Sequence, residues 1–402
     1  MKSVIRAYVL ILAVAILAWP PGAQAQSAQS RNANPEQATP QAHTGPLRAS
    51  NKARVNAGTV GFVADTVSST NTRMTSDIAA VFDNGDKLRI LPVLGRGALQ
   101  SITDILYLRG IDFGIVQSDV LKYIKDERIY PSIENRINYI TKLHNQEFHI
   151  IAGKGIGSLA DLNGRKVNIG IRGSGSHITA TAVFKASGVE VDATEYDEAN
   201  ALDKLRLGEI AAMVYVAGKP APLFAQVAAD QNLHLVPVPF NDKLGDYLPA
   251  KFTAADYPGL VESGKTVPTI AVRAVLAVFN WAPGSERYKK VVNFISTFFT
   301  KFSELRKPPR HPKWREVNIH AKVPGWRRFP PASEWVARNA RQVAENRIKM
   351  QPKKDGRIKQ AFLKFLNSRR GGRAQSRLKD PDVNELFEQF VKWQRAQPRS
   401  AN

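Results

Sequence analysis

The hydrophobic pattern of this chain alternates short apolar runs with longer segments whose apolar residues recur at helical spacing. The runs have the length of buried strands, and helical segments separate them, which is typical of parallel sheets covered by helices. The expected strands are residues 58–64, 88–94, 112–116, 148–153, 166–171, 211–216 and 233–239. The expected helices are residues 75–82, 98–108, 158–162, 177–188 and 200–209. The alternation occurs once before Phe148 and again after it, so the sequence predicts an α/β protein with two similar lobes.

The N-terminal segment has the pattern of a secretory signal peptide. Lys2 and Arg6 precede an apolar run, which ends in a Pro-Pro break and the small-residue motif at Ala23 and Ala25. We therefore expect residues 1–25 to be a signal peptide cut after Ala25. The alternative is a membrane anchor, although the apolar run is shorter than the about 20 residues of a spanning helix. Residues 26–56 carry few large apolar side chains and are expected to be a disordered linker.

Composition refines this interpretation. The chain of 402 residues contains no cysteine. An exported protein without disulfides suits a bacterial periplasm, which is the expected location. The formal net charge is +22, and much of the excess lies in a basic C-terminal extension at residues 337–402. Nucleic acid is not an expected partner of an exported chain.

The basic extension contains two amphipathic helical segments, at residues 357–368 and 380–393. Such a tail can dock on an anionic envelope surface, such as lipid or acidic polysaccharide, or on a membrane partner. The alternative is that the helices pack on the protein's own surface and the charge only solvates them.

Polar loops follow the expected strands. Ligands of open α/β sheets bind outside the carboxyl ends of the strands, where the loops lead into helices. The loops concerned are residues 66–73, 95–97, 117–119, 172–177 and 217–220. The Gly-Ser loop at 173–176 begins a helix, and the free N–H groups of a helix N-terminus favour an anion. Helix capping explains each loop taken singly, but together they predict a ligand cleft between the lobes.

Four segments in order resemble the TAXI family of extracytoplasmic solute-binding proteins, the soluble receptors of one branch of the TRAP transporters. They are FGIVQSDV from Phe113, FHIIAGKGIGSLADLNGRKVNIGIRGSGS from Phe148, LRLGEIAAMVYVAGKPAP from Leu205, and VPTIAVRAVLAVFN from Val267. The resemblance covers residues 58–336 and includes the later segment HPKWREVN. No single motif is specific, but their combination in this order is.

The resemblance implies a two-lobed type II periplasmic-binding-protein fold with crossover hinge strands, near residues 148–152 and 269–276, and closure around a solute. Lobe one would comprise residues 58–147 and 274–336, and lobe two residues 148–273. The expected function is capture of a small anionic solute, a glutamate-like amino acid or a dicarboxylate, and its delivery to a TRAP-type membrane permease. The alternative is a non-transport sensor or envelope-interaction protein with a modified cleft and a basic partner-binding tail.

The resemblance and the polar loops together name the candidate ligand-binding residues. They are Ser69, Thr70, Asn71, Thr72, Arg73, Arg96, Gly97, Gln117, Ser118, Arg172, Ser174, Gly175, Ser176, Tyr215, Ala217 and Gly218. The sequence departs from the family at residues 68–74, SSTNTRM, where members usually have a Gly-rich loop with a Tyr-Tyr-Pro stretch. Three arginines, Arg73, Arg96 and Arg172, would favour an anionic solute because guanidinium groups bind carboxylates in a bidentate way. The alternative is that they face solvent or pair with nearby aspartates.

Catalytic and metal motifs are absent from the sequence. There is no cysteine nucleophile, no GxSxG elbow and no HExxH motif. The glycine-rich stretch at residues 153–157 lacks the GxxxxGK[ST] pattern of a phosphate-binding loop. We therefore expect neither an enzyme nor a bound metal or cofactor.

Overall fold

The computed structural model describes residues 46–350, apart from residues 68, 86, 226 and 228–231. The expected signal peptide, residues 26–45 of the expected linker and residues 351–402 of the expected extension lie outside the described residues. Among the described helices, none combines the length and the apolar character needed to cross a membrane.

Residues 46–57 form helix α1 (Pro46–Ala57), where the sequence analysis placed the end of a disordered linker. That part of the prediction is wrong. It rested on the scarcity of large apolar side chains, which reports on packing and not on helix propensity. Pro46 is tolerated in the first turn because it needs no N–H partner there, and Leu, Arg, Ala and Lys, all strong helix formers, follow it.

A ten-stranded sheet runs through the protein in the order β2-β1-β3-β10-β4-β7-β5-β6, with β8 paired to β4 and β9 paired to β10. The strands are β1 (Thr59–Val63), β2 (Arg89–Val93), β3 (Phe113–Gln117), β4 (Ile137–Ala152), β5 (Lys166–Asn168), β6 (Asp192–Thr194), β7 (Ala212–Ala217), β8 (His234–Leu235), β9 (Leu248–Thr253) and β10 (Thr266–Phe279).

The same strand order occurs twice. In lobe one, β2, β1 and β3 are parallel and β10 adds antiparallel to β3. In lobe two, β6, β5 and β7 are parallel and β4 adds antiparallel to β7. Each lobe thus receives one long strand that passes on into the other lobe. This arrangement confirms the expected two-lobed periplasmic-binding-protein fold.

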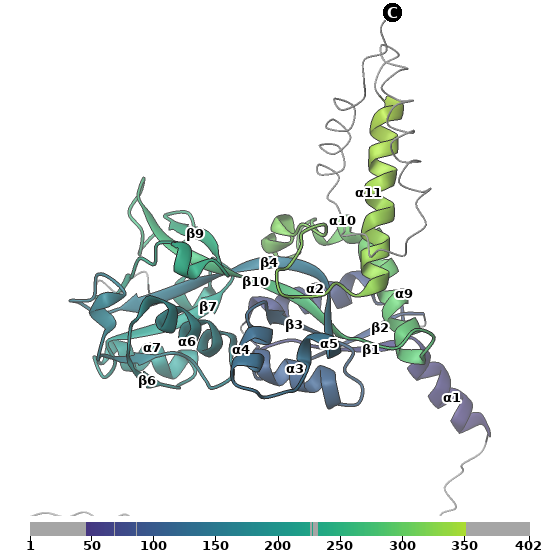
Figure 1. Ribbon diagram of the computed structural model, residues 1–402, viewed down its shortest axis with the longest axis horizontal. Coiled ribbons are helices and arrows are strands. Elements are labelled where there is room, and N and C mark those ends of the chain that lie inside the picture. Colours follow the sequence, from purple (N-terminus) through teal and green to yellow (C-terminus); the bar gives the residue numbers. More distant parts are fainter. Residues whose placement is uncertain (1–45, 68, 86, 226, 228–231, 351–402) are drawn as a thin grey trace, which may run out of the picture. The chain divides into compact units, whose positions relative to one another are not determined.

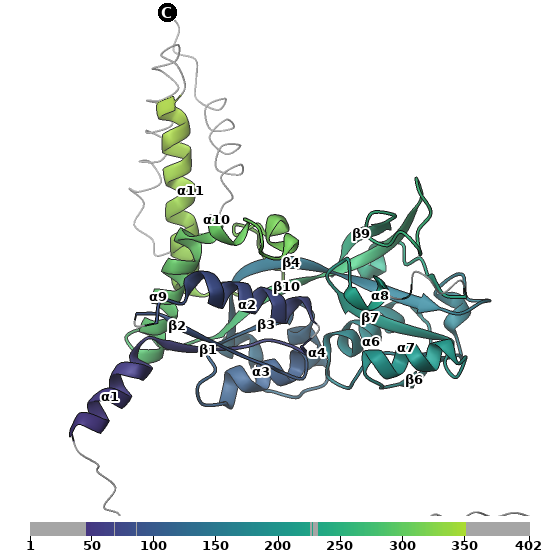
Figure 2. The same cartoon turned by 180° about the vertical axis from the view of Figure 1, so that it is seen from behind.

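The two long strands β4 and β10 connect the lobes (Figures 1 and 2). Strand β10 pairs with β9 over residues 266–271 and with β3 over residues 274–278, so its crossing falls inside the expected interval. Strand β4 pairs with β7 only over residues 147–152, while residues 137–142 pair with the lobe-one end of β10. The crossing in β4 therefore comes several residues before the expected interval 148–152.

Helices cover the sheets of both lobes. Those of lobe one and the segment after it are α2 (Thr70–Phe82), α3 (Ala98–Tyr107), α4 (Val120–Asp126), α5 (Ile133–Arg136), α9 (Glu286–Thr300), α10 (Phe302–Leu305), η3 (Pro312–Glu316) and α11 (Pro330–Met350). Those of lobe two are η1 (Ala160–Leu162), α6 (Gly175–Ser187), α7 (Glu198–Arg206), α8 (Pro222–Ala225) and η2 (Asp242–Leu244).

The cores consist of apolar side chains from the strands and the helices that face them. In lobe one, Phe62, Phe113 and Phe294 are fully buried, and the rings of Phe113 and Phe294 lie 4.4 Å apart between centroids. In lobe two, α6 packs Val183 and Phe184 against strands β4, β5 and β7. Each Å² of apolar surface removed from water stabilises the fold by about 25 cal/mol. These cores thus fix the strands whose ends carry the loops.

Candidate functional site

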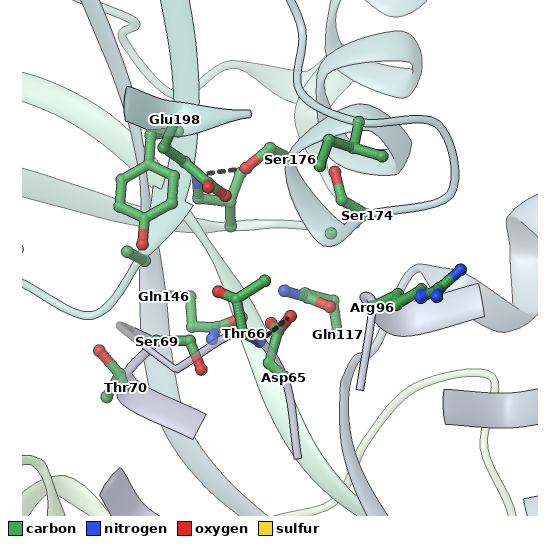
Figure 3. Close-up of a pocket in the computed structure, with 15 residues that line it drawn as sticks. Asp65, Thr66, Ser69, Thr70, Arg96, Gln117, Gln146, Ser174, Ser176 and Glu198 are labelled. Carbon is green, nitrogen blue, oxygen red and sulfur yellow. Dashed lines mark hydrogen bonds between the residues drawn. The ribbon is translucent and has the colours of Figure 1, made fainter. Parts of the chain in front are cut away.

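A small pocket, with a cavity volume of about 20 Å³, lies between the two lobes (Figure 3). Lobe one contributes Asp65, Thr66, Ser69, Thr70, Arg96, Gln117 and Gln146. Lobe two contributes Ile171, Ser174, Gly175, Ser176, Glu198, Tyr215, Val216 and Ala217. We call this space the cleft pocket.

The carboxyl ends of the strands supply most of its wall. Asp65 and Thr66 follow β1, Gln117 is the last residue of β3, and Ala217 is the last residue of β7. Ser174 follows β5 and caps helix α6. The pocket thus lies at the carboxyl ends of the strands, where ligands of open α/β sheets bind.

The N-terminus of helix α6 faces the pocket with two hydroxyl groups. The oxygen of Ser174 accepts a hydrogen bond from the N–H of His177 at 3.2 Å, and the oxygen of Ser176 accepts one from the N–H of Val216 at 3.0 Å. Each hydroxyl keeps its own hydrogen to donate. Together with the positive end of the helix dipole, these donors suit a carboxylate.

The two lobes touch beside this helix end. The N–H of Leu99 in lobe one donates to the carbonyl oxygen of Gly173 in lobe two at 3.1 Å. Gly97 has φ +121°, and a Cβ atom there would lie 2.7 Å from the Cα atom of Ser174. Only glycine fits at this close approach. The described conformation is therefore one in which the lobes are closed on each other.

Helix α2 begins at the opposite wall. Ser69 caps it by accepting from the N–H of Thr72 at 3.1 Å, and the hydroxyl of Thr72 donates to the carbonyl oxygen of Thr66 at 2.8 Å. Asn71 is buried, and its Oδ1 accepts from the side-chain amide of Gln146 at 3.0 Å. Thr72 and Asn71 thus shape the loop and support Gln146 without lining the pocket.

Two carboxylates that the sequence analysis did not name as ligand groups, Asp65 and Glu198, line the pocket from opposite lobes. Burial raises the pKa of Asp65, although the N–H of Thr66 donates to its Oδ1 at 2.9 Å. Burial also raises the pKa of Glu198, and the negative charge of Asp65 adds to the effect. The phenol of Tyr215 has a raised pKa through burial and through both carboxylates. The interior of the pocket is therefore electronegative.

The three arginines expected around an anionic solute do not gather there. Arg96 lines the pocket and is exposed (Figure 3). Arg172 is 75% exposed and pairs with Glu195, with 2.8 Å between Nη2 and Oε1. Arg73 lines a separate groove on the far side of Thr70. Thr70, three residues earlier on α2, lines both this groove and the cleft pocket, whereas Arg73 lines the groove alone.

Two further candidate ligand-binding residues, Ser118 and Gly218, do not line the pocket but contact its surroundings. Ser118 uses its backbone, donating to the oxygen of Arg273 at 2.8 Å and accepting from the indole N–H of Trp326 at 2.7 Å. Gly218 packs against Thr70, and a Cβ atom at this glycine would lie 3.1 Å from the side chain of Thr70.

A buried ion pair lies behind the pocket, next to the crossing in β4. The ammonium of Lys313 is 2.9 Å from Oε1 of Glu147, and both side chains are almost fully buried. Oε2 of Glu147 also accepts from the N–H of Lys219 at 2.8 Å, in the loop that follows β7. Glu147 thus connects Lys313, in the C-terminal part of lobe one, to a loop of lobe two.

Metal coordination has no candidate cluster in the described part of the chain, where no three His, Cys, Asp or Glu side chains come together in a suitable way.

Solved structures resemble this fold at low sequence identity. The alkanesulfonate-binding protein SsuA from Xanthomonas axonopodis pv. citri bound to MOPS is 13% identical, over 62% of this chain and 75% of that chain, with a TM-score of 0.39. R. palustris Rpa4515 with adipate is 18% identical, over 62% and 86%, with a TM-score of 0.39. A TctC solute-binding protein from Polaromonas is 14% identical, over 61% and 87%, with a TM-score of 0.35. These similarities say nothing of what this chain binds.

The fold is that of the two-lobed periplasmic binding proteins, with the pocket at their cleft. Residues 86–319, more than half of the chain, match the model of the NMT1-like family. The chain belongs to the NMT1-like family. This match does not assign the chain to the TAXI family in particular.

Proposed function

We propose that this protein is a solute-binding receptor that captures a small solute in the cleft pocket and delivers it to a membrane transporter. The observation that carries the proposal is the place of the pocket, because loops at the carboxyl ends of strands in both lobes line it and the two lobes touch beside it. We place the receptor in the TAXI branch, in the periplasm, with a TRAP-type permease as its partner, on the motifs from residue 113 to residue 318.

The charges of the pocket favour a zwitterion. The serine hydroxyls at the start of α6 and the guanidinium of Arg96 suit a carboxylate, whereas Asp65 and Glu198 suit an ammonium group. A dicarboxylate without an amine would place a second negative charge beside those two carboxylates, which is unfavourable in a partly buried site. Of the two expected solute classes, we therefore propose the glutamate-like amino acid.

Thermal unfolding of the secreted protein against amino acids, dicarboxylates and other organic acids tests this function. A solute that binds only the native state at 100 times its dissociation constant adds roughly 2.7 kcal/mol to the free energy of unfolding. We expect an upward shift with an α-amino acid, reduced by Ser174→Ala. No shift with any member of the panel would contradict a receptor for such solutes and favour the sensor alternative.

A further inference from the structure

Gln146 is a buried residue of the cleft pocket to which the proposed function gives no role. It is 2% exposed and lines the pocket (Figure 3). It lies where β4 crosses between the lobes, since it pairs with Val272 of β10 and the pairing of β4 with β7 begins at Glu147. Its side chain therefore reaches the pocket from a strand that both lobes share.

The side-chain amide of Gln146 has a defined orientation. The side chain of Asn71 interacts with the carboxylate of Asp65 and counteracts the rise of its pKa through burial. An ionised carboxylate only accepts hydrogen bonds, so the NH₂ end of Asn71 faces it. Oδ1 of Asn71 then accepts from Nε2 of Gln146 at 3.0 Å. Oε1 of Gln146 is buried, and none of the described residues donates to it.

A buried acceptor without a donor indicates where a ligand's donor belongs. Buried carbonyl oxygens are almost always hydrogen-bonded, because a missing partner costs stability. Two further acceptors line the same pocket, the carboxylates of Asp65 and Glu198. The three groups come from lobe one, from lobe two and from the crossing strand. A primary ammonium group has three N–H donors and a positive charge, so it matches these acceptors in number and in charge.

The two carboxylates also act on each other across the cleft. Asp65 follows β1 and Glu198 is in the first turn of α7, on opposite sides of the pocket (Figure 3). Burial raises the pKa of Glu198, and the negative charge of Asp65 raises it further. Closure brings these like charges together in a partly buried space, where they repel more strongly than in water. Without a cation between them, this repulsion opposes closure.

We propose that Asp65, Glu198 and Gln146 form an ammonium subsite, and that the bound cation is what allows the lobes to close. The cation replaces the repulsion between the two carboxylates by two attractions, and Oε1 of Gln146 accepts its third N–H. That this cation is the amino group of the solute rests on the proposed function. The repulsion between the lobes does not, because it follows from the two carboxylates alone.

The first test follows the distance between the lobes of the secreted protein without solute. The chain has no cysteine. Arg109→Cys in lobe one and Glu190→Cys in lobe two, both at exposed positions, therefore carry a single pair of spin labels for double electron–electron resonance. Glu198→Gln removes one of the two facing charges at constant size. Glu262→Gln, at an exposed residue of lobe two that pairs with Lys265, is the matched control.

We expect the unliganded wild type and Glu262→Gln to have the same distance distribution, with the open arrangement dominant. Glu198→Gln should shift the distribution toward the closed arrangement, because the repulsion is gone. Equal distributions in all three proteins, or an equal shift in Glu262→Gln, would overturn the role of the facing carboxylates in closure.

The second test uses methylammonium chloride as the probe, with sodium chloride at the same ionic strength as its control. Methylammonium should close the wild type, and sodium should not. Gln146→Met, which removes the third acceptor, should raise the methylammonium concentration needed by about tenfold, whereas Gln146→Glu, which keeps an acceptor and adds a charge, should lower it. Equal effects of the two salts would overturn the ammonium subsite, and an unchanged requirement in both variants would overturn the role of Gln146.

The proposed function can fail separately from this inference. If no amino acid stabilises the protein against thermal unfolding, the proposed solute is wrong. The label distances in the unliganded protein still decide whether Asp65 and Glu198 oppose closure, and methylammonium still decides whether a cation relieves that opposition.

Discussion

Gly175 of lobe two lies directly against the side-chain amide of Gln117 of lobe one, so that a Cβ atom at this glycine would overlap that amide group. Gln117 is 2% exposed and has little room to move aside. A side chain at the first residue of α6 would therefore force the amide group of Gln117 to shift where the two lobes meet. The contact joins two polar loops of the cleft pocket, so closure and solute contact depend on the same pair.

Replacing Gly175 should impair closure more than folding. We expect Gly175→Ala to weaken solute binding by about tenfold or more, with little change in thermal stability, because alanine is a good helix residue at this φ. Small-angle scattering with solute present should show less compaction than in wild type.

The partner residue gives the control for this prediction. Adding Gly175→Ala to a Gln117→Ala background should cost much less affinity than it does in wild type, since the overlapping amide is gone. Equal losses in both backgrounds would contradict a clash between these two residues.

A second contact between the lobes predicts a pH dependence. Asp119 of lobe one accepts from the hydroxyl of Thr179 at 2.7 Å and from that of Tyr247 at 3.3 Å, both in lobe two. Burial raises the pKa of Asp119 from 3.8 to about 6. The native protein therefore holds a proton that the unfolded chain releases, and its stability decreases as the pH rises from about 4 to about 6.

Denaturant unfolding between pH 4 and pH 7.5 measures this effect. Between these pH values, the free energy of unfolding of the wild type should fall by about 1–3 kcal/mol more than that of Asp119→Asn, since an amide does not ionise. Asp126→Asn, in an exposed pair with Lys122, is the matched control and should leave the slope unchanged. Parallel profiles for wild type and Asp119→Asn would contradict the raised pKa.

The buried pair of Glu147 and Lys313 predicts a large loss of stability. Glu147→Gln removes a carboxylate that neutralises the buried ammonium of Lys313. Removing one partner of a buried ion pair lowers the free energy of unfolding by about 3–5 kcal/mol. Glu304→Gln, which breaks the exposed pair with Lys307, should cost less than about 1 kcal/mol. Urea unfolding compares the two, and similar losses would show that the pair behind the pocket contributes no more than a surface pair.

Much of the fold followed from local patterns, but the first half of the hinge strand β4 did not. The strands 58–64 and 112–116 were recognised because their apolar residues are buried by helices close in sequence. The first half of β4 was missed because Lys142, His144 and Gln146 interrupt its apolar pattern. All three are buried in the structure. For such polar residues, burial is decided by tertiary contacts that no window of sequence contains.

The residues of the candidate site were likewise predicted only in part. Gln117 was predicted because it directly follows an expected strand, and Ser174 and Ser176 because they lie where an expected strand leads into an expected helix. Asp65 also follows a strand, but it was considered only as a partner for an arginine. Glu198 comes before the expected helix 200–209 and was not considered, and its place opposite Asp65 depends on how the lobes close. The sequence therefore indicated the position of the cleft pocket more securely than the charge of its lining.

Isothermal titration calorimetry of one amino acid and its deaminated analogue tests the central claim most directly. Wild-type protein should bind the amino acid at least about a hundredfold more tightly than the analogue, and Asp65→Asn should remove most of that preference. Equal or tighter binding of the analogue by wild-type protein would show that Asp65 and Glu198 do not select an ammonium group, and it would contradict the account.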